Sequence, residues 1–585
     1  MINKLTKKTI SFCLSFLIIF FFLIPLTACA PTSTPNQLVT SIVGDPKTFN
    51  AVLSQESPNI FGLVYEGLIT ENPITGQKEP VLAEKWEVSE DKLSIIVTLK
   101  KDLKWSDGQP LTIDDVLFSY NELYLNPKIP NNYRDSFRIG RSQSFPTIKK
   151  LEDRSIEFRI TEPFAPFLDT LSVPILPKHI LKPTIEKKSS DGKLQFLSTW
   201  GVDTPPEKII VNGAYKLKNY TTGQRIIFDK NPYYWKKDTQ GNQLPHIAQV
   251  IWAIVESQDT ALLQFRSKSL DYIGVTPEYF SLLKKEDERG NFTIFNGGPA
   301  YGTNFLSFNL NQGSRNGKPL IDPIKAKWFN NVKFRQAVAY GIDRTRMINN
   351  IYRGLGEKQN SFMSIQSPFY NQSLAGYDYN PEQAKALLQE AGFKYNSDNQ
   401  LVDSDNHIVR FNLLTNAGNP IREAIGAQIK EDLSKIGIIV DFAPIAFSVL
   451  VDKLSNSLDW ESYILGFTGD NEPHAPNIWY TDGNLHAFNQ KPQPGIPPVD
   501  GRILYDWEKE IENLYIEGAK ELNIEKRKVI YNEAQQLMSE YLPFIYLVNP
   551  LALSAVRNCF EEIQFSALGG AFWNLEELKN TCGNS

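Results

Sequence analysis

The stretch Leu103-Lys-Trp-Ser-Asp-Gly-Gln-Pro-Leu-Thr-Ile-Asp-Asp-Val116 decides how the rest of the chain is interpreted. We interpret its Trp-Ser-Asp-Gly portion as a structural turn. Thr112 is a good N-cap for a helix that we predict over 114–125. The preceding segment 93–99 is rich in β-branched residues and predicts a strand. A strand, a turn and a helix in succession favour an α/β protein.

Helices with one apolar face follow further along the chain. Each begins or ends at a residue suited to that place, as when Asn380 caps a helix that Pro381 opens and Gly392 ends. Such apolar stripes indicate core, and they do not identify a ligand. The predicted elements are helices over 381–391, 424–435 and 332–353, the last broken near Asp343, and strands over 438–442 and 462–466.

Several other motifs lie in a fixed order around the opening stretch. Together with it they resemble the extracellular solute-binding proteins of family 5, which serve peptide-importing ABC transporters, over residues 37 to 560. The match departs from the family pattern at Val211, Asn212 and Ala214, where the family has Gly, Thr and Pro. The motifs are Val64-Tyr-Glu-Gly-Leu68, Pro80–Trp86, Val211-Asn-Gly-Ala-Tyr-Lys-Leu217, Asn231-Pro-Tyr-Tyr-Trp235, Arg335–Arg344, Pro381–Gly392 and Lys435–Ile438.

The resemblance implies a particular domain organisation. Two α/β lobes of the type II periplasmic-binding-protein fold are joined by a hinge, and the first lobe carries an extra subdomain. The run Tyr541–Leu547 is strand-like and is expected to cross back between the lobes. The expected divisions are lobe I over 37–75, 206–300 and 541–585, the inserted subdomain over 76–205, and lobe II over 301–540.

The N-terminus has the pattern of an export signal. Lysines precede an apolar run over 10–26, with no acidic residue among them. The sequence Leu26-Thr-Ala-Cys29 resembles the lipobox of bacterial lipoproteins, in which the cysteine receives acyl chains. We predict a signal peptide over 1–28, lipidation of Cys29, and a tether over 29–36. An uncleaved anchor, or an ordinary signal peptide with a chance cysteine, is the alternative.

Charge and cysteine content narrow the class of protein. The chain has 61 basic and 66 acidic side chains, and loss of the leader leaves 58 against 66, or −8. A nucleic-acid-binding protein needs a basic footprint, so we expect no nucleic-acid partner. After export and lipidation, Cys559 and Cys582 remain. A disulfide between them is our prediction for an oxidising compartment, and two free buried thiols are the alternative.

Catalytic and metal-binding patterns are missing from the sequence. It contains no His-Glu-x-x-His, no Gly-x-Ser-x-Gly and no Cys-x-x-Cys. We therefore expect no enzymatic activity, no cofactor and no metal. Among five histidines, His474 and His486 are close enough in sequence to share a cleft, which keeps a metal site as an alternative.

The resemblance also indicates where a ligand would bind. Gly466-Phe-Thr-Gly-Asp-Asn471 resembles the family's GWTGDN segment, whose Asp meets a ligand α-ammonium group, and Phe467 replaces the common Trp. Residues 301–304, ahead of a predicted strand over 305–309, resemble the segment that pairs with a peptide backbone. A turn that Asp470 caps and a plain strand start are the alternatives. The predicted ligand-binding residues are Tyr301, Gly302, Thr303, Asn304, Phe467, Thr468, Gly469, Asp470, Asn471 and Trp479.

These inferences predict a monomeric, extracytoplasmic protein that is lipid-anchored to the cell membrane. It would capture di- or oligopeptides between its lobes and deliver them to the permease subunits of an ABC transporter. Trp105 and Tyr480 are further aromatic candidates for the cleft wall, and no motif identifies the basic partner of a ligand carboxylate. The alternatives are a nickel chelate, haem, glutathione or an oligosaccharide as ligand, a peptide-sensing receptor that does not transport, and a secreted enzyme.

Overall fold

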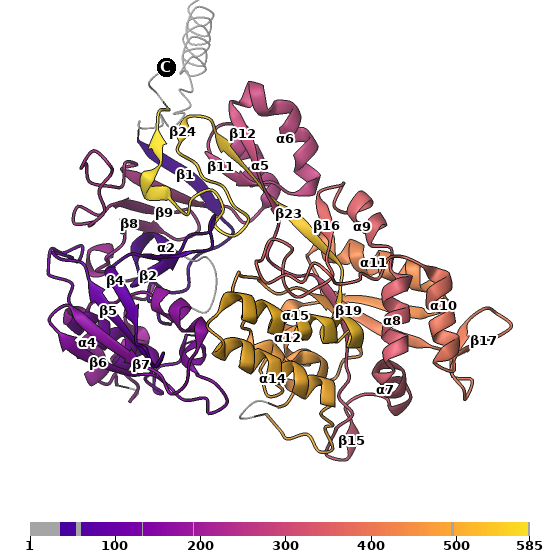
Figure 1. The fold of residues 1–585 in the computed structure, drawn as a ribbon. Coiled ribbons are helices and arrows are strands. Elements are labelled where there is room, and N and C mark those ends of the chain that lie inside the picture. The colour runs from indigo at the N-terminus through magenta and orange to yellow at the C-terminus, as the bar shows by residue number, and fades with distance from the viewer. Residues whose placement is uncertain (1–35, 54–59, 132, 191, 493–495, 583–585) are drawn as a thin grey trace, which may run out of the picture.

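Two lobes make up the protein (Figure 1). The structure is a computed structural model that describes residues 36–53, 60–131, 133–190, 192–492 and 496–582. Lobe I holds two clusters of buried apolar side chains, drawn mainly from residues 38–292 and completed by C-terminal residues such as Leu578. Lobe II holds another cluster, drawn from residues 305–548.

The predicted signal peptide, the predicted lipidation site at Cys29 and almost all of the predicted tether lie outside the described residues. Within the described ranges, no helix combines the length and the apolar character needed to cross a membrane.

Lobe I is built on two sheets and an inserted subdomain. The first sheet has the order β1-β10-β9-β8, in which only β1 and β10 are parallel. The second has the order β11-β23-β12 and is antiparallel. The bounds are β1 (Gln37–Ile42), β8 (Tyr215–Thr221), β9 (Arg225–Lys230), β10 (Gln249–Ile254), β11 (Tyr272–Gly274), β12 (Phe292–Pro299), β23 (Val548–Arg557), α2 (Phe61–Val64), α5 (Gln258–Arg266) and α6 (Pro277–Gly290).

The inserted subdomain contains an antiparallel sheet in the order β4-β5-β7-β6. Its helix α3 begins where the sequence predicts, because Thr112 and Asp115 form a capping box. The α-helix ends earlier than predicted and continues as a π-helix over Phe118–Tyr124. The bounds are β4 (Ala83–Val88), β5 (Ser94–Leu99), β6 (Thr147–Glu152), β7 (Ser155–Arg159), α3 (Ile113–Leu117) and α4 (Lys178–Glu186), with the hairpin β2 (Ile69–Glu71) and β3 (Lys78–Pro80) preceding them.

Lobe II is organised around a five-stranded sheet in the order β20-β19-β21-β13-β22. Strands β20, β19 and β21 are parallel, and β13 is antiparallel to both of its neighbours. The bounds are β13 (Phe305–Phe308), β19 (Arg410–Asn416), β20 (Ile439–Ile445), β21 (Ser462–Leu465), β22 (Ile545–Tyr546), α7 (Pro323–Asn330), α8 (Val332–Gly341), α9 (Arg344–Asn350), α10 (Pro381–Glu390), α11 (Pro420–Ser434), α12 (Phe447–Asp452), α13 (Pro476–Trp479), α14 (Asp506–Lys520) and α15 (Ile524–Tyr541).

Most of the predicted helices in lobe II occur with the predicted caps. Asn380 accepts a hydrogen bond from the Gln383 N–H, and Asp343 caps the second half of the broken helix. The helix predicted over 424–435 begins earlier, at Pro420, because Asn419 caps it by accepting a bond from the Arg422 N–H.

The strand that returns to lobe I differs from the one expected over 541–547. Helix α15 continues to Tyr541, and Ile545–Tyr546 pair with β13 inside lobe II. The crossing strand is β23, which pairs with the short lobe II strand β16 (Gly356–Lys358) at its start and with β11 and β12 at its end (Figure 1). The crossing begins later, at Val548, because Ile545 and Tyr546 are used to pair with β13.

Three of the motifs that carry the family resemblance, at 64–68, 211–217 and 231–235, meet at one place in lobe I. The Glu66 carboxylate accepts hydrogen bonds from the Tyr234 hydroxyl and the Trp235 indole N–H, both at 2.6 Å. Asn212 accepts a bond from the Glu66 N–H and donates to its carbonyl oxygen. Burial raises the pKa of Glu66 to about 7, with the two side-chain bonds opposing the shift. We call Glu66 and these partners the motif junction.

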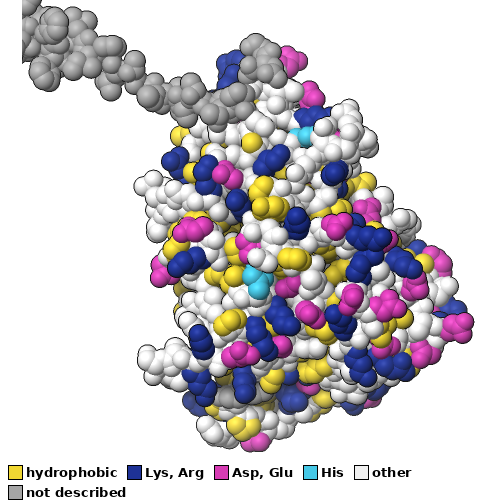
Figure 2. Space-filling model, turned by 90° about the vertical axis from the view of Figure 1, so that its left-hand side faces the viewer, with side chains coloured by type: hydrophobic (Ala, Val, Ile, Leu, Met, Phe, Trp, Pro, Cys, Tyr) yellow, Lys and Arg dark blue, Asp and Glu magenta, His cyan; other side chains and the backbone are white. Residues whose placement is uncertain are grey.

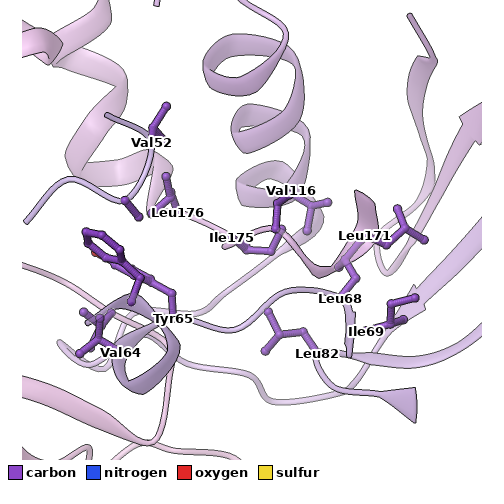
Figure 3. Packing of buried hydrophobic residues seen from close by; sticks show 14 of the residues in the cluster. Val52, Val64, Tyr65, Leu68, Ile69, Leu82, Val116, Leu171, Ile175 and Leu176 are labelled. Carbon is purple, nitrogen blue, oxygen red and sulfur yellow. The ribbon is translucent and has the colours of Figure 1, made fainter. Parts of the chain in front are cut away.

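The opening stretch of the sequence adjoins the motif junction. The Ser106 N–H donates to the Val211 carbonyl at 2.8 Å, and the Val211 N–H donates to the Ser106 hydroxyl at 3.0 Å. Trp105 is fully buried, so it belongs to the core and not to a cleft wall. Figure 3 shows the neighbouring packing, in which Val64, Tyr65, Leu68, Leu82 and Leu176 belong to one buried apolar cluster. The motif residues therefore join the subdomain to lobe I.

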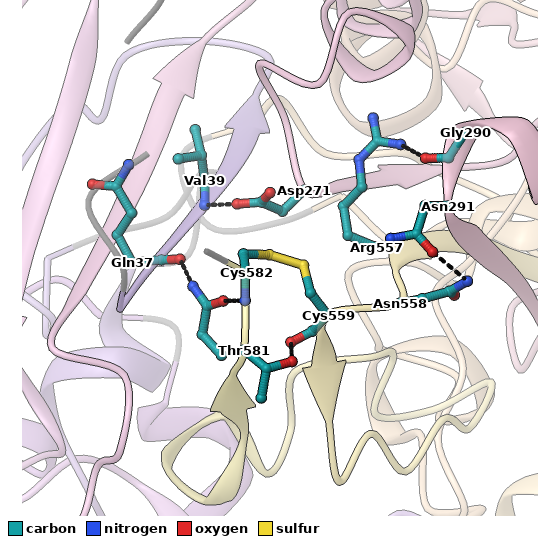
Figure 4. The surroundings of a disulfide bond; sticks show 11 residues. Gln37, Val39, Asp271, Gly290, Asn291, Arg557, Asn558, Cys559, Thr581 and Cys582 are labelled. Atoms are coloured by element: carbon teal, nitrogen blue, oxygen red, sulfur yellow. Dashed lines mark hydrogen bonds between the residues drawn. A yellow bond between two sulfur atoms is a disulfide. The ribbon is translucent and has the colours of Figure 1, made fainter. Parts of the chain in front are cut away.

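A disulfide joins Cys559 and Cys582, whose Cα atoms are 5.0 Å apart (Figure 4). The strands next to it, β24 (Phe560–Glu561) and β25 (Lys579–Asn580), pair with each other. The Asn580 side chain donates to the Gln37 carbonyl at 2.6 Å. The bridge therefore holds the C-terminal segment against β1, the first strand of lobe I.

Candidate ligand-binding cleft

The carboxyl ends of three parallel strands, β19, β20 and β21, lie at one edge of the lobe II sheet, which we call the carboxyl edge. The loop after β19 leads into α11, the loop after β20 leads into α12, and the loop after β21 contains residues 466–471. In open α/β sheets, ligands bind in the crevice outside such an edge. This edge therefore brings the GWTGDN-like segment beside two loops that carry no recognisable motif.

Two predicted segments that are far apart in the sequence lie against each other. The Thr303 N–H donates to the Phe467 carbonyl at 2.9 Å, and the Phe467 N–H donates to the Thr303 hydroxyl at 3.1 Å. A Cβ on Gly469 would lie 1.8 Å from the Tyr301 carbonyl oxygen, and one on Gly466 would lie 2.1 Å from that of Thr303. Only glycine permits this close approach of the two backbones.

The start of the crossing strand β23 is bonded to the same segments. We call residues 300–304, 466–469 and 548–549 together the backbone cluster. The Asn549 side chain donates to the carbonyls of Ala300 and Gly302. The Asn304 side chain donates to the Val548 carbonyl at 3.3 Å. The two segments in which the chain passes between the lobes are thus bonded to each other at residues 300–304 and 548–549.

Asp470 projects from this cluster as an exposed carboxylate. Its Oδ1 accepts a hydrogen bond from the Asn471 N–H at 2.7 Å, and among the described residues it has no ion-pair partner. The surrounding protein removes enough water to raise the pKa of Asp470. Glu71 adds to this rise, whereas the Asn471 bond and Lys78 oppose it. The group is suited to bind a cation.

Lobe I faces this loop with the β2–β3 hairpin. The Asn471 side chain donates to Glu71 Oε1 at 2.6 Å, which bonds the two lobes directly. Lys78 forms ion pairs with Glu71 and with Asp169. Burial raises the pKa of Asp169 to about 6, although Lys78 opposes the shift. The lobes therefore meet through a network of charged groups.

Further contacts close the lobes along the inserted subdomain. The Lys520 ammonium lies 2.9 Å from Glu162, and the rings of Phe164 and His474 are 5.2 Å apart. Beyond them is a cavity of about 480 Å³ between the subdomain and lobe II. Its lining includes Arg141, Gln143, Tyr480, Arg502 and Glu512.

Comparison with known proteins identifies the family of the chain. The family described as "Bacterial extracellular solute-binding proteins, family 5 Middle" matches residues 77–489. The chain belongs to this family.

A curated relative, the "Probable ABC transporter-binding protein" of Deinococcus radiodurans, is 30% identical over 527 residues, which cover 86% of this chain and 85% of the relative. Two solved structures share the fold. The oligopeptide-binding protein AppA from Bacillus subtilis, in complex with a nonapeptide, has a TM-score of 0.71 and 22% identity and covers 94% of this chain and all of that one. NikZ from Campylobacter jejuni, in complex with Ni(L-His), has a TM-score of 0.73 and 20% identity with the same coverage.

The fold expected from the sequence, an α/β periplasmic-binding-protein fold, is therefore confirmed. The chain is therefore a solute-binding protein and not an enzyme, and its curated relative is named for an ABC transporter.

The predicted ligand-binding residues do not all face the cleft of this solute-binding protein. Thr468 and Asp470 are exposed, while Thr303 and Asn471 are buried. Trp479 is only 1% exposed and packs against Phe362 and Phe544 inside lobe II, so we correct its placement on the cleft wall. The single-turn helix α13 directs this ring inward.

Phe467 also belongs partly to the core. It is half-buried, and its ring centroid lies 4.8 Å from that of Phe305. Tyr480 is 5% exposed and lines the cavity described above.

Two residues of the carboxyl edge have no sequence motif to mark them. Arg422 donates to Asn416 Oδ1 at 3.0 Å, and its guanidinium lies beside Gly466. Phe447 is 57% exposed at the start of α12. Arg422 follows β19 and Phe447 follows β20 along the chain. The sequence does not show that these two strands are parallel neighbours, so it does not predict that the two residues lie at the same edge.

The histidines do not form a metal site in the cleft. His486 is buried between the Glu508 carboxylate and the Ile478 carbonyl, and burial lowers the pKa of His474 to about 3. In the described part of the chain, one group of possible ligands lies close together: Asp403, Asp405 and His407. It precedes β19, at the edge of the sheet opposite Asp470.

Proposed function

We propose that this solute-binding protein captures peptides between its lobes, with the ligand's amino terminus at Asp470. The observation that carries the proposal is the exposed carboxylate of Asp470 at the carboxyl edge of the lobe II sheet, which has no ion-pair partner among the described residues. A charge-assisted hydrogen bond from an ammonium group would satisfy it. The complex of AppA with a nonapeptide supports a peptide as ligand for this fold.

The remainder of a peptide would be bound by groups that do not depend on its sequence. The segments 301–304 and 466–469 lie against each other next to Asp470, and backbone groups that they do not use for each other would pair with the peptide in a strand-like way. We assign Arg422 as the cation for a ligand carboxylate or carbonyl, because it lies beside Gly466 on the same edge. Phe447 would offer an apolar surface to a ligand side chain.

We further propose that Cys29 carries the lipid anchor and that the two lobes face the outside of the cell membrane. The lipobox-like sequence and the family's extracellular character support this. Metabolic labelling with a radioactive fatty acid tests it, since Cys29→Ser is expected to remove the label. Retention of the label in this variant would contradict the anchor.

A metal chelate is the second candidate ligand, since NikZ of the same fold holds Ni(L-His). Native mass spectrometry of the protein purified without denaturation distinguishes the candidates. We expect co-purified peptides of mixed sequence. A metal chelate, haem or a glycan in their place would overturn the peptide proposal.

A further inference from the structure

A small cavity lies in lobe II, close to the point where the chain leaves for lobe I. Its volume is about 20 Å³, which is room for one water molecule or one ion of similar size. Arg344, Gln359, Asn360 and Tyr546 are among the residues that line it, and none of the lining residues is acidic. The cavity therefore has polar walls without a negative charge.

Arg344 brings a buried positive charge to this cavity. Its side chain donates hydrogen bonds only to neutral oxygens, the carbonyls of Gln359 and Tyr377 and the Oδ1 atom of Asn360. A guanidinium group has five N–H donors, so these three bonds leave donors for a further acceptor. Arg344 is 6% exposed, and burial lowers its pKa to about 10. The low pKa shows that the surrounding protein does not compensate the charge fully.

No carboxylate among the described residues forms an ion pair with Arg344. Asp378 opposes the lowering of the pKa of Arg344, but this carboxylate is largely exposed and is paired with Lys358. The buried Arg527 of the same lobe, by contrast, lies 2.5 Å from Glu472. Buried charges in proteins are normally paired in this way. Arg344 thus lacks the counter-charge that Arg527 has.

Tyr546 supplies a second donor at the same cavity. It is 5% exposed, and its hydroxyl is buried without a hydrogen-bond partner among the described residues. Burial raises the pKa of Tyr546, so the hydroxyl keeps its proton and remains a donor. Arg335 is also buried without a carboxylate partner in the described chain, but it does not line this cavity. Arg344 differs from Arg335 in sharing a cavity with a second donor.

We propose that this cavity binds one small monovalent anion, of the size of chloride, through the Arg344 guanidinium group and the Tyr546 hydroxyl. The anion would supply the missing counter-charge and accept bonds that both side chains can donate. A cavity of about 20 Å³ is too small for a phosphate or for the carboxylate of a peptide. The anion site is therefore separate from the ligand cleft and does not depend on the proposed function.

The anion site adjoins both segments in which the chain passes between the lobes. The Gln359 N–H donates to the Leu547 carbonyl at 3.1 Å, and Gln359 Oε1 accepts a bond from the Asn304 N–H at 3.3 Å. The Leu547 N–H in turn donates to the Asn304 carbonyl at 2.9 Å. Because Arg344 donates to the Gln359 carbonyl, an anion bound to Arg344 is expected to stabilise the start of the crossing as well as lobe II.

Bromide is the probe for the first test, because it resembles chloride chemically and is located by its anomalous scattering. Crystals of the purified full chain are soaked in sodium bromide. We expect an anomalous peak in the cavity, within hydrogen-bond distance of the Arg344 guanidinium group and the Tyr546 hydroxyl. A water molecule at this position in the presence of bromide would overturn the proposal.

The second test follows thermal unfolding in solution as sodium chloride replaces sodium gluconate at constant ionic strength. Gluconate is too large for the cavity, so the midpoint of wild type should rise with chloride until the site is saturated. Tyr546→Phe keeps the ring and removes one donor. The chloride concentration that gives half of the rise should therefore increase about tenfold in this variant.

Tyr531→Phe is the matched control. The Tyr531 hydroxyl is likewise buried in lobe II without a hydrogen-bond partner, but Tyr531 does not line the cavity, so this variant should respond to chloride as wild type does. A midpoint of wild type that does not depend on chloride, or the same dependence in wild type and Tyr546→Phe, would overturn the proposal. Neither test uses a peptide, so failure of the proposed function would leave both results unchanged.

Discussion

The motif junction and the cleft differ in how far their carboxylates are bonded within the protein. At the junction, both oxygens of Glu66 are bonded, one by the buried Tyr234 and the other by the half-buried Trp235. In the cleft, Asp470 is left exposed and without an ion-pair partner among the described residues. The difference shows that the motifs which meet at the junction hold the fold together, whereas the motif at 466–471 presents a group to a ligand. The groups available to a ligand are those that the fold leaves unsatisfied.

The largest expected effect lies next to the junction. Trp105→Ala removes a fully buried ring and should lower the free energy of unfolding by about 3–5 kcal/mol. The affinity for ligand should stay near wild type at temperatures where the variant is folded. Chemical denaturation and calorimetry measure the two quantities, and a weakened affinity in folded protein would erase the distinction between the regions.

The opposite pattern is expected for the cleft. Asp470→Asn removes a charged partner of the proposed ligand ammonium group, which should weaken peptide binding about 10- to 100-fold. The midpoint of thermal unfolding should change little, because Asp470 is exposed and has no ion pair within the described chain. Calorimetric titration with a peptide identified by mass spectrometry makes the measurement. Wild-type affinity would remove Asp470 from the site.

The junction should also show a distinctive dependence on pH. Burial raises the pKa of Glu66 to about 7 in the folded protein, so between its ordinary value and 7 the folded state binds more protons than the unfolded state. The contribution of Glu66 to stability is therefore present at low pH and is lost as pH rises toward 7, by at most about 1.4 kcal/mol per pH unit. The free energy of unfolding of Glu66→Gln, taken relative to that of wild type, should therefore increase from pH 5 to pH 8. A difference that does not vary with pH would contradict a raised pKa.

The smallest effect is expected where the lobes meet at the surface. Lys520 and Glu162 form an ion pair that is partly exposed to solvent, and such pairs contribute about 0–1 kcal/mol. Lys520→Ala should therefore weaken ligand binding by no more than about fivefold, and high salt should reduce the difference. A larger loss would show that the inserted subdomain takes a direct part in closure.

Local patterns allowed much of the fold to be predicted. The caps at Thr112, Asp343 and Asn380 occur as expected, because a cap depends on bonds within a few residues of chain. The return to lobe I was misplaced, since Ile545–Tyr546 have the same strand-like composition as the true crossing strand. Composition does not tell which strand pairs with which.

The site was only partly predictable for the same reason. The loop around Asp470 was found through its motif, whereas Arg422, Phe447 and Glu71 are marked only by their position in the fold. Trp479 was misjudged because an aromatic residue near a motif is equally compatible with a wall and with a core. Burial depends on neighbours such as Phe544, which are distant in the sequence.

The sequence by itself determined the family, the places of most helices and strands, and the likeness of 466–471 to a ligand-contacting loop, because each depends on residues close together in the chain. The tertiary structure alone decided which groups share the cleft. Asn471 meets Glu71, and Gly469 meets Tyr301, only after strands distant in sequence are paired and the lobes close. Contacts of this range depend on the packing of the whole chain, which no local pattern of residues specifies.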